Sequence, residues 1–269
     1  AALFLVEEYI GRWAQEARQL ALKANVAAAD SVLGQALAYA PDSKQLHYYR
    51  GRFYFEYGQR ERGLGILRKN MLLIDVPALD EAPAVDGRLD ESAWSQAAVI
   101  DTFYKWGHSR TNMLPLAPTR AYLGYTREAF FVGIHCYDAH PESLVVMRLE
   151  DSNSSSQIQD LVEILFDRNL DQRTLSAFKI NTVADVRDGW QAKSRDLSWD
   201  ADMMVATAVG SDHWSVELQL NWDPKYHPPP VSGDVSGFNI QRCFRGREYS
   251  QVFRDYDSDN DTPGYLAFK

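Results

Sequence analysis

Four aspartates stand at alternate positions in the stretch FRDYDSDND (253–261), near the C-terminal end of the chain. Carboxylates at this spacing converge on one Ca²⁺ in an EF-hand loop, which also needs Gly at its sixth position and Glu at its twelfth. Those positions hold Asn260 and Leu266 here, and the GYLAFK segment is typical of a strand, so an EF-hand is excluded. Another kind of calcium site, direct ligand contact and a solvated acidic loop stay open. The candidate calcium ligands are Asp255, Asp257 and Asp259, together with Asp138 at the end of another strand-like run.

Carboxylates also occur inside the strand-like segments, where a glycosidase would need two of them about 5–9 Å apart. The available acids are Glu163, Glu217 and Asp160, but acidic side chains on an exposed sheet face are usually solvated or hydrogen-bonded. The sequence has no G-x-S-x-G, H-E-x-x-H, Walker or G-x-G-x-x-G motif, and its six histidines are scattered. We therefore predict that the chain is not an enzyme.

The overall composition argues against several classes of partner. A formal net charge of −9 with no basic run disfavours nucleic acid and anionic membrane surfaces, because phosphate binding needs clustered Lys and Arg. No apolar stretch is long enough to span a bilayer, and the opening AALFLV is too short for a signal-peptide core. Cys136 and Cys243 each lie in a strand-like run, which favours buried thiols, while pairing in an oxidising compartment stays open.

Residues 1–75 contain one proline and carry apolar residues at helical spacing, with a repeat period of 34 residues. The small, aromatic and apolar positions of the two repeats are Trp13, Ala17, Leu20, Ala29, Leu33, Ala36, Pro41, Gly51, Tyr54, Gly63 and Leu67. This order resembles tetratricopeptide repeats, which implies paired antiparallel helices that serve as a scaffold or as a docking surface for a protein partner. The small residues would let the paired helices approach closely. An unrelated helical hairpin bundle is the alternative.

The composition changes at DVPALDEAPAVDG (75–87), where prolines and a glycine interrupt the helical period. We place a domain boundary near Asp75, between the helical segment 1–75 and a second domain, 76–269. That domain has short runs rich in aromatic and β-branched residues, at 119–126, 128–138, 159–167, 174–182, 200–209, 213–220, 236–244 and 264–269. The predicted fold class is multidomain, α followed by all-β, with antiparallel sheets packed as a β-sandwich.

Six motifs occur in an order found in one known family. They are VDGRLDESAW (85–94), EAFFVGIHCYD (128–138), QDLVEILFD (159–167), FKIN (178–181), HWSVELQL (213–220) and GFNIQ (237–241). The second domain resembles family 9 carbohydrate-binding modules and their β-sandwich relatives, including a variant found in bacterial outer-membrane proteins. The resemblance implies noncovalent glycan binding, structural calcium, and an extracellular, periplasmic or cell-surface location.

The first of these motifs has a structural interpretation of its own. Gly87 permits the turn that Asp86 opens, and Asp90 can cap the short helical turn that follows. Trp94 supplies a large apolar anchor against the sandwich. We also assign Trp214, in an alternating strand, to the core.

The resemblance further implies a binding face in which a sugar ring is clamped between two aromatic rings. Charged and amide side chains hydrogen-bond the hydroxyls, and these positions match Glu163, Lys179 and Gln241. Gln157 stands roughly where the family has one clamp tryptophan, so that ring is absent here. The candidate stacking residues are Phe253 and Tyr256 at the other clamp position, and Trp190 and Trp106 as replacements in polar surroundings.

The sequence is compatible with three functions. The first is glycan binding by the sandwich, with the helical segment as a scaffold. The second is a protein-interaction or assembly module of a bacterial envelope complex, which keeps the fold without sugar affinity. The third is a b-type haem-binding sandwich, for which axial ligands could come from Met147, Met203, Met204 and Lys179. No organic cofactor is expected for the first two.

Overall fold

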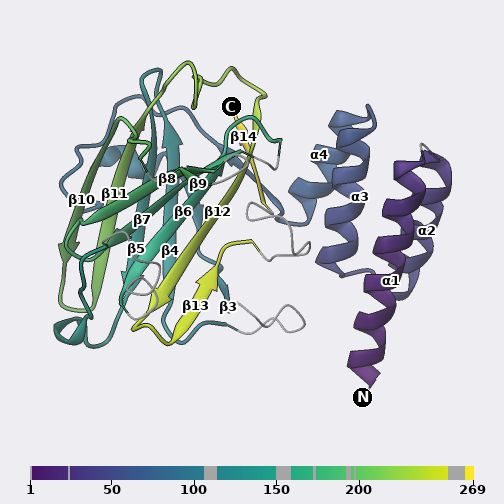
Figure 1. The fold of residues 1–269 in the computed structure, drawn as a ribbon, viewed down its shortest axis with the longest axis horizontal. Coiled ribbons are helices and arrows are strands. Elements are labelled where there is room, and N and C mark those ends of the chain that lie inside the picture. Colours follow the sequence, from purple (N-terminus) through teal and green to yellow (C-terminus); the bar gives the residue numbers. More distant parts are fainter. Residues whose placement is uncertain are drawn as a thin grey trace. The chain divides into compact units, whose positions relative to one another are not determined.

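The computed structural model describes residues 2–23, 25–105, 114–149, 159–171, 174–191, 195–196, 198–253 and 264–269 (Figure 1). The chain divides into two compact units, Ala1–Ile74 and Asp75–Lys269, so the division lies where the composition changes. Within the described residues, every helix is too short or too polar to cross a membrane.

The first unit is helical. Its described residues form α1 (Ala2–Leu22), α2 (Val26–Tyr39), α3 (Lys44–Glu56) and α4 (Arg60–Lys69). Two of the helices begin at side-chain caps, since Asn25 Oδ1 accepts a hydrogen bond from Ala28 N and Ser43 Oγ accepts one from Leu46 N. The helices pack as two hairpins, α1 with α2 and α3 with α4.

Small residues bring the helices of the second hairpin together. A Cβ atom added at Gly63 would lie 2.6 Å from the carbonyl oxygen of Gly51, and one added at Gly51 would lie 2.6 Å from Leu67 Cγ. Ala17 and Ala29 are buried in the core of the helical unit. The predicted close approach at Gly51 and Gly63 is thus confirmed, whereas four helices do not establish the tetratricopeptide family, which stays a prediction.

The second unit is a β-sandwich of two sheets (Figure 1). Sheet A has the order β1 (Leu73–Val76), β14 (Gly264–Phe268), β12 (Val235–Phe244), β6 (Leu161–Asp167), β7 (Leu175–Asn181), β8 (Val186–Gln191) and β9 (Arg195–Asp196), with β13 (Glu248–Gln251) on β12 and β3 (Tyr104–Lys105) on β13. Sheet B has the order β10 (Met203–Val209), β11 (His213–Asn221), β5 (Ala129–Tyr137), β4 (Thr119–Tyr125) and β2 (Ala98–Ile100). The 3-10 turns η1 (Ser92–Ser95) and η2 (Pro141–Ser143) lie in the connections.

The core lies between the sheets. Along β6, Val162, Ile164 and Phe166 are buried, and the ring of Phe166 stacks on Phe130 of sheet B with centroids 5.2 Å apart. Since side chains alternate along a strand, Glu163 lies on the other face, which points away from sheet B. The helix-then-sandwich fold class is confirmed, and all eight predicted strands are present.

The VDG motif is held by a buried acid. Glu217 on β11 accepts hydrogen bonds from the backbone N of Asp86 (2.9 Å) and Gly87 (2.7 Å) and from Trp94 Nε1 (2.9 Å). Gly87 has a φ of +91°, which confirms its role in the turn. The predicted cap at Asp90 is wrong, because the residue before η1 is Glu91 and its side chain makes no capping bond.

A tryptophan and both cysteines of the sandwich lie in its interior. Trp214 is fully buried, as predicted. Cys136 and Cys243 are both buried free thiols, one in each sheet, which confirms the interpretation as small apolar side chains.

Candidate functional site

The pairing register of sheet A aligns polar side chains on its open face, the face that points away from sheet B. Gln241 on β12 lies opposite Glu163 on β6, and Glu163 lies opposite Lys179 on β7. Residues paired in this way have their side chains on the same face, and adjacent strands are about 4.8 Å apart. The three predicted hydroxyl partners therefore lie side by side across roughly 10 Å.

The same line of pairs continues on both sides. Gln251 on β13 lies opposite Gln241, and Arg187 on β8 lies opposite Lys179. We call Gln251, Gln241, Glu163, Lys179 and Arg187 the open-face row. The two outer members have no signal in the sequence, because β8 and β13 lack an alternating pattern and only the register reveals their alignment.

The central pair of the row is only loosely held. Lys179 Nζ lies 3.6 Å from Glu163 Oε2, and each side chain is 16% exposed. This distance is long for a hydrogen bond, and partly exposed ion pairs contribute about 0–1 kcal/mol to stability. This ion pair by itself therefore adds little to the stability of the sheet.

Apolar side chains lie on both sides of the open-face row. One cluster contains Leu165, Leu175 and Ala177, and the other contains Leu149, Leu161 and Cys243 with the half-buried Tyr249 packed against it. Apart from Tyr249, the residues of both clusters are buried, so they pack around the row and help to fix its position.

The predicted stacking residues do not join this row where they are described. Phe253 is 3% exposed, and its ring covers Gly264 so closely that an added Cβ would lie 1.9 Å from Phe253 Cδ2. The expectation of a solvent-facing ring at Phe253 is therefore not met, because the ring fills the space above this glycine. Trp106 and Tyr256 lie outside the described residues.

Trp190 lies on the opposite face of sheet A. It is three residues beyond Arg187 on β8, and side chains alternate along a strand. Its ring packs with those of Trp199 and Tyr226, at centroid distances of 5.8 and 5.0 Å. The three half-buried rings fill the rim of the sandwich, away from the open-face row.

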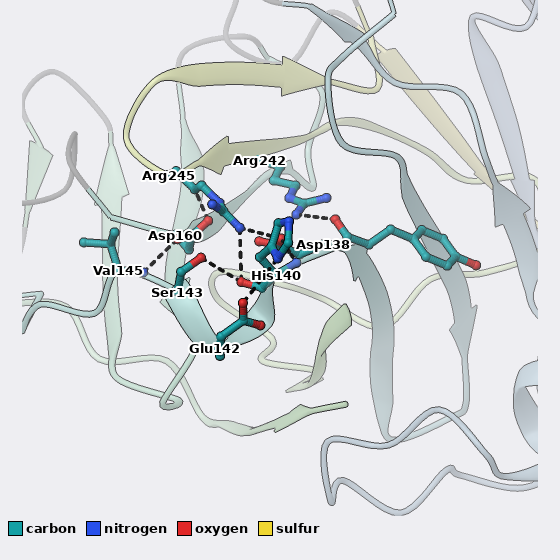
Figure 2. Close-up of polar contacts among 9 residues, drawn as sticks. Asp138, His140, Glu142, Ser143, Val145, Asp160, Arg242 and Arg245 are labelled. Carbon is teal, nitrogen blue, oxygen red and sulfur yellow. Dashed lines mark hydrogen bonds and ion pairs between the residues drawn. The ribbon is translucent and has the colours of Figure 1, made fainter. Parts of the chain in front are cut away.

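The candidate metal ligand Asp138 belongs to a network of buried polar contacts, drawn in Figure 2. Asp138 is 3% exposed, and its Oδ1 accepts hydrogen bonds from Arg245 Nη2 (2.7 Å) and His140 N (2.8 Å). Asp160 accepts hydrogen bonds from the backbone N of Arg245 and Val145, both at 2.9 Å. We call these five residues the Asp138 network.

One oxygen of Asp138 already has a cationic partner, which disfavours calcium there. Calcium takes six to eight oxygen ligands, whereas a guanidinium faces this carboxylate. Asp255, Asp257 and Asp259 lie outside the described residues, so calcium in that loop stays a prediction. Among the described residues, one acidic cluster has carboxylate oxygens close enough together to bind one metal ion; it consists of Asp86, Glu91 and Glu217. Both oxygens of Glu217, however, already accept hydrogen bonds from protein groups.

Glycoside hydrolysis and haem binding each need a pair of side chains close together, and several of the candidate side chains lie in different sheets. The acids Glu163 and Glu217 are in different sheets, and Asp160 is bound by two backbone amides. Lys179 is likewise in sheet A, while Met203 and Met204 are in sheet B. Met147 lies nearer to Lys179, since its carbonyl oxygen accepts a hydrogen bond from Asn181 Nδ2, so haem binding stays a prediction.

Several solved structures resemble the fold. No protein-family model matches the sequence, and no curated protein does so either. A family 9 carbohydrate-binding module from Caldicellulosiruptor kristjanssonii, in complex with cellotriose, has a TM-score of 0.52 and 18% identity over 73% of this chain and 93% of its own. The same organism's module in complex with glucose has a TM-score of 0.53 and 18% identity over 72% of this chain and 95% of its own.

A third structure comes from Bacteroides uniformis and has a proposed carbohydrate-binding role. Its TM-score is 0.55 with 10% identity over 73% of this chain and 99% of its own. At these identities the likeness establishes the fold of the sandwich.

Proposed function

We propose that the sandwich binds a glycan noncovalently at the open-face row of sheet A. The observation that carries the proposal is the cross-strand alignment of Gln241, Glu163 and Lys179. A carboxylate accepts hydroxyl protons, an ammonium donates to hydroxyl oxygens, and an amide does both. The complexes of the structural neighbours with cellotriose and glucose support the same ligand class.

Binding of this kind depends on a few charge-assisted hydrogen bonds. Hydrogen bonds to charged groups contribute about 1.5–3 kcal/mol, which corresponds to roughly ten- to hundredfold in affinity. Replacing Glu163 with Gln removes the charge but keeps the size of the side chain. Replacing Gln241 with Ala removes both a donor and an acceptor.

A glycan array tests the proposal directly. Wild type, Glu163→Gln and Gln241→Ala are applied to neutral and acidic oligosaccharides that include cellotriose, and positive ligands are measured by calorimetry. We expect each variant to lose roughly tenfold or more in affinity. Matched controls are Glu128→Gln, at an exposed site, and Gln219→Ala, which is half-buried on β11 in sheet B. Equal binding by all five proteins would place the site elsewhere.

Calcium is tested in the same experiment. We propose the 253–261 loop as the calcium site, because its alternating carboxylates repel one another unless a cation relieves them. Glycan binding or thermal stability that falls with EDTA and returns with added Ca²⁺ supports this role. Unchanged binding and stability in EDTA would leave the loop as a solvated acidic segment.

A protein-docking role for the helical unit is a second proposal. The rings of Tyr9, Trp13 and Tyr39 form a continuous ladder, with centroids 6.1 and 5.7 Å apart, while Tyr9 is 52% and Tyr39 is 79% exposed. Exposed aromatic clusters are characteristic of protein interfaces. A photo-crosslinking residue at position 39 should give a discrete adduct with a partner protein in cells, and one at the exposed Gln19 should not. Identical labelling at both positions would contradict the proposal.

Both roles fit a protein located outside the cytoplasm. We propose an extracellular, periplasmic or cell-surface location, where glycans are the accessible polymers. Fractionation of the source cells tests it, and recovery in the cytoplasmic fraction would contradict it.

A further inference from the structure

An aromatic side chain lies beside the open-face row at a position without any signal in the sequence. Tyr249 on β13 pairs with Cys243 on β12, and Cys243 is two residues beyond Gln241. Because side chains alternate along a strand, Tyr249 shares the open face with the row. Its ring is half-buried, packing against Leu149, Leu161 and Cys243.

Tyr249 is also within electrostatic reach of the acid at the centre of the row. Leu161, a member of the cluster against which the ring packs, precedes Glu163 by two residues on β6 and faces the same way. Burial raises the pKa of the Tyr249 hydroxyl, and contact with the Cys243 thiol and the negative charge of Glu163 raise it further. The phenol is therefore neutral at physiological pH, and its ring is within electrostatic reach of Glu163.

We propose that Tyr249 is the stacking residue of the saccharide site, an inference that rests on the proposed glycan-binding function. In this arrangement, the apolar C–H face of a sugar ring packs on the part of the Tyr249 ring that the protein leaves accessible. The hydroxyl edge of the sugar then meets Gln241 and Glu163. The packing of Tyr249 on Leu161 and Cys243 fixes the ring before a ligand arrives, so little side-chain freedom is lost on binding.

The other described rings are less suitable for this role. Phe253 is buried and Trp190 lies on the opposite face. Tyr104 pairs with Gln251 and shares the open face, but its strand β3 lies one strand further from Glu163 than β13, which carries Tyr249. Tyr249 is thus the described ring that can contact a sugar while that sugar also contacts Glu163.

Two substitutions test the contributions of the Tyr249 ring and of its hydroxyl group separately. Tyr249→Phe keeps the stacking surface and removes the hydrogen bond to Cys243, whereas Tyr249→Leu removes the ring. On the array described above, we expect Tyr249→Leu to lose roughly tenfold or more in affinity and Tyr249→Phe to stay within about threefold of wild type. Trp190→Leu is the matched control, because it removes a half-buried ring from the opposite face, and it should bind as wild type.

The outcomes distinguish this inference from the function on which it rests. If Glu163→Gln loses binding while Tyr249→Leu retains it, the stacking role is wrong and the glycan site stands. If wild type binds no saccharide on the array, both proposals fail.

A measurement on the wild-type protein covers the case in which Tyr249→Leu does not fold. Sugar C–H protons of a bound array ligand should shift upfield in proton NMR, because they lie over an aromatic ring, and the shifts should persist in Tyr249→Phe. Bound ligand without such shifts would overturn the stacking role.

Discussion

Two carboxylates three residues apart have opposite roles in the second unit. Asp160, just before β6, is fully buried, and its two oxygens accept backbone N–H groups from two different loops. Glu163, within β6, is partly exposed and lies 3.6 Å from a lysine. Burial and short contacts to backbone make the Asp138 network part of the scaffold, whereas Glu163 and Lys179 are each 16% exposed and pair over a longer distance.

Removing Asp160 should give the largest effect on stability. Asp160→Ala leaves the backbone N–H groups of Val145 and Arg245 without their acceptor, at a cost of roughly 2–5 kcal/mol in free energy of unfolding. Urea denaturation followed by tryptophan fluorescence reports mainly on the sandwich, because six of the seven tryptophans lie after residue 75. Asp200→Ala, at an exposed aspartate, is the control and should change stability by less than about 0.5 kcal/mol. If Asp160→Ala changed the free energy of unfolding by as little, Asp160 would not be a structural carboxylate, and its contrast with Glu163 would be wrong.

Acid should destabilise the scaffold through His227, which is buried and lies 2.8 Å from Ser176 Oγ through its Nε2 atom. Burial lowers the pKa of His227 to about 4, below the usual value of about 6.5 in the unfolded chain. The unfolded state then binds the proton first, so stability is full above pH 6.5 and falls as the pH decreases toward 4. His227 alone should cost about 2 kcal/mol between pH 7 and pH 5.

Unfolding curves at pH 7 and pH 5 measure this loss, and His227→Gln provides the comparison because glutamine keeps a donor but does not titrate. The loss should be smaller in that variant. His135, whose pKa burial also lowers to about 4, contributes with the same sign and stays in both proteins. Equal losses in the two proteins would exclude His227 from the acid response.

The sequence predicts the fold and the centre of the site, but not its surroundings. Long runs rich in apolar, aromatic and β-branched residues predict β6, β7 and β12, and these strands carry Glu163, Lys179 and Gln241. The segments VRDGWQ and EYSQ do not alternate clearly, so the sequence predicts neither β8 and β13 nor the residues that they align.

The aromatic residues were the least predictable part. Whether a ring is exposed depends on tertiary neighbours: Phe253 is buried because Gly264, eleven positions further along the chain, leaves space beneath it. Asp138 pairs with Arg245, which lies 107 residues away in the sequence. Neither interaction can be inferred from the residues next to Phe253 or Asp138 in the sequence.

The Glu163–Lys179 pair should have the smallest effect on stability and therefore gives the sharpest test of the contrast. We expect Glu163→Gln and Lys179→Met each to change the free energy of unfolding by less than about 1 kcal/mol, with a coupling energy of about 0–1 kcal/mol in a double-mutant cycle. Glycan affinity should fall in both single variants, since each removes a charged hydrogen-bonding group. A coupling energy above about 2 kcal/mol would mean that the pair holds the sheet together as the Asp138 network holds the loops. Burial and pairing distance would then fail to separate ligand-binding charges from structural ones in this sandwich.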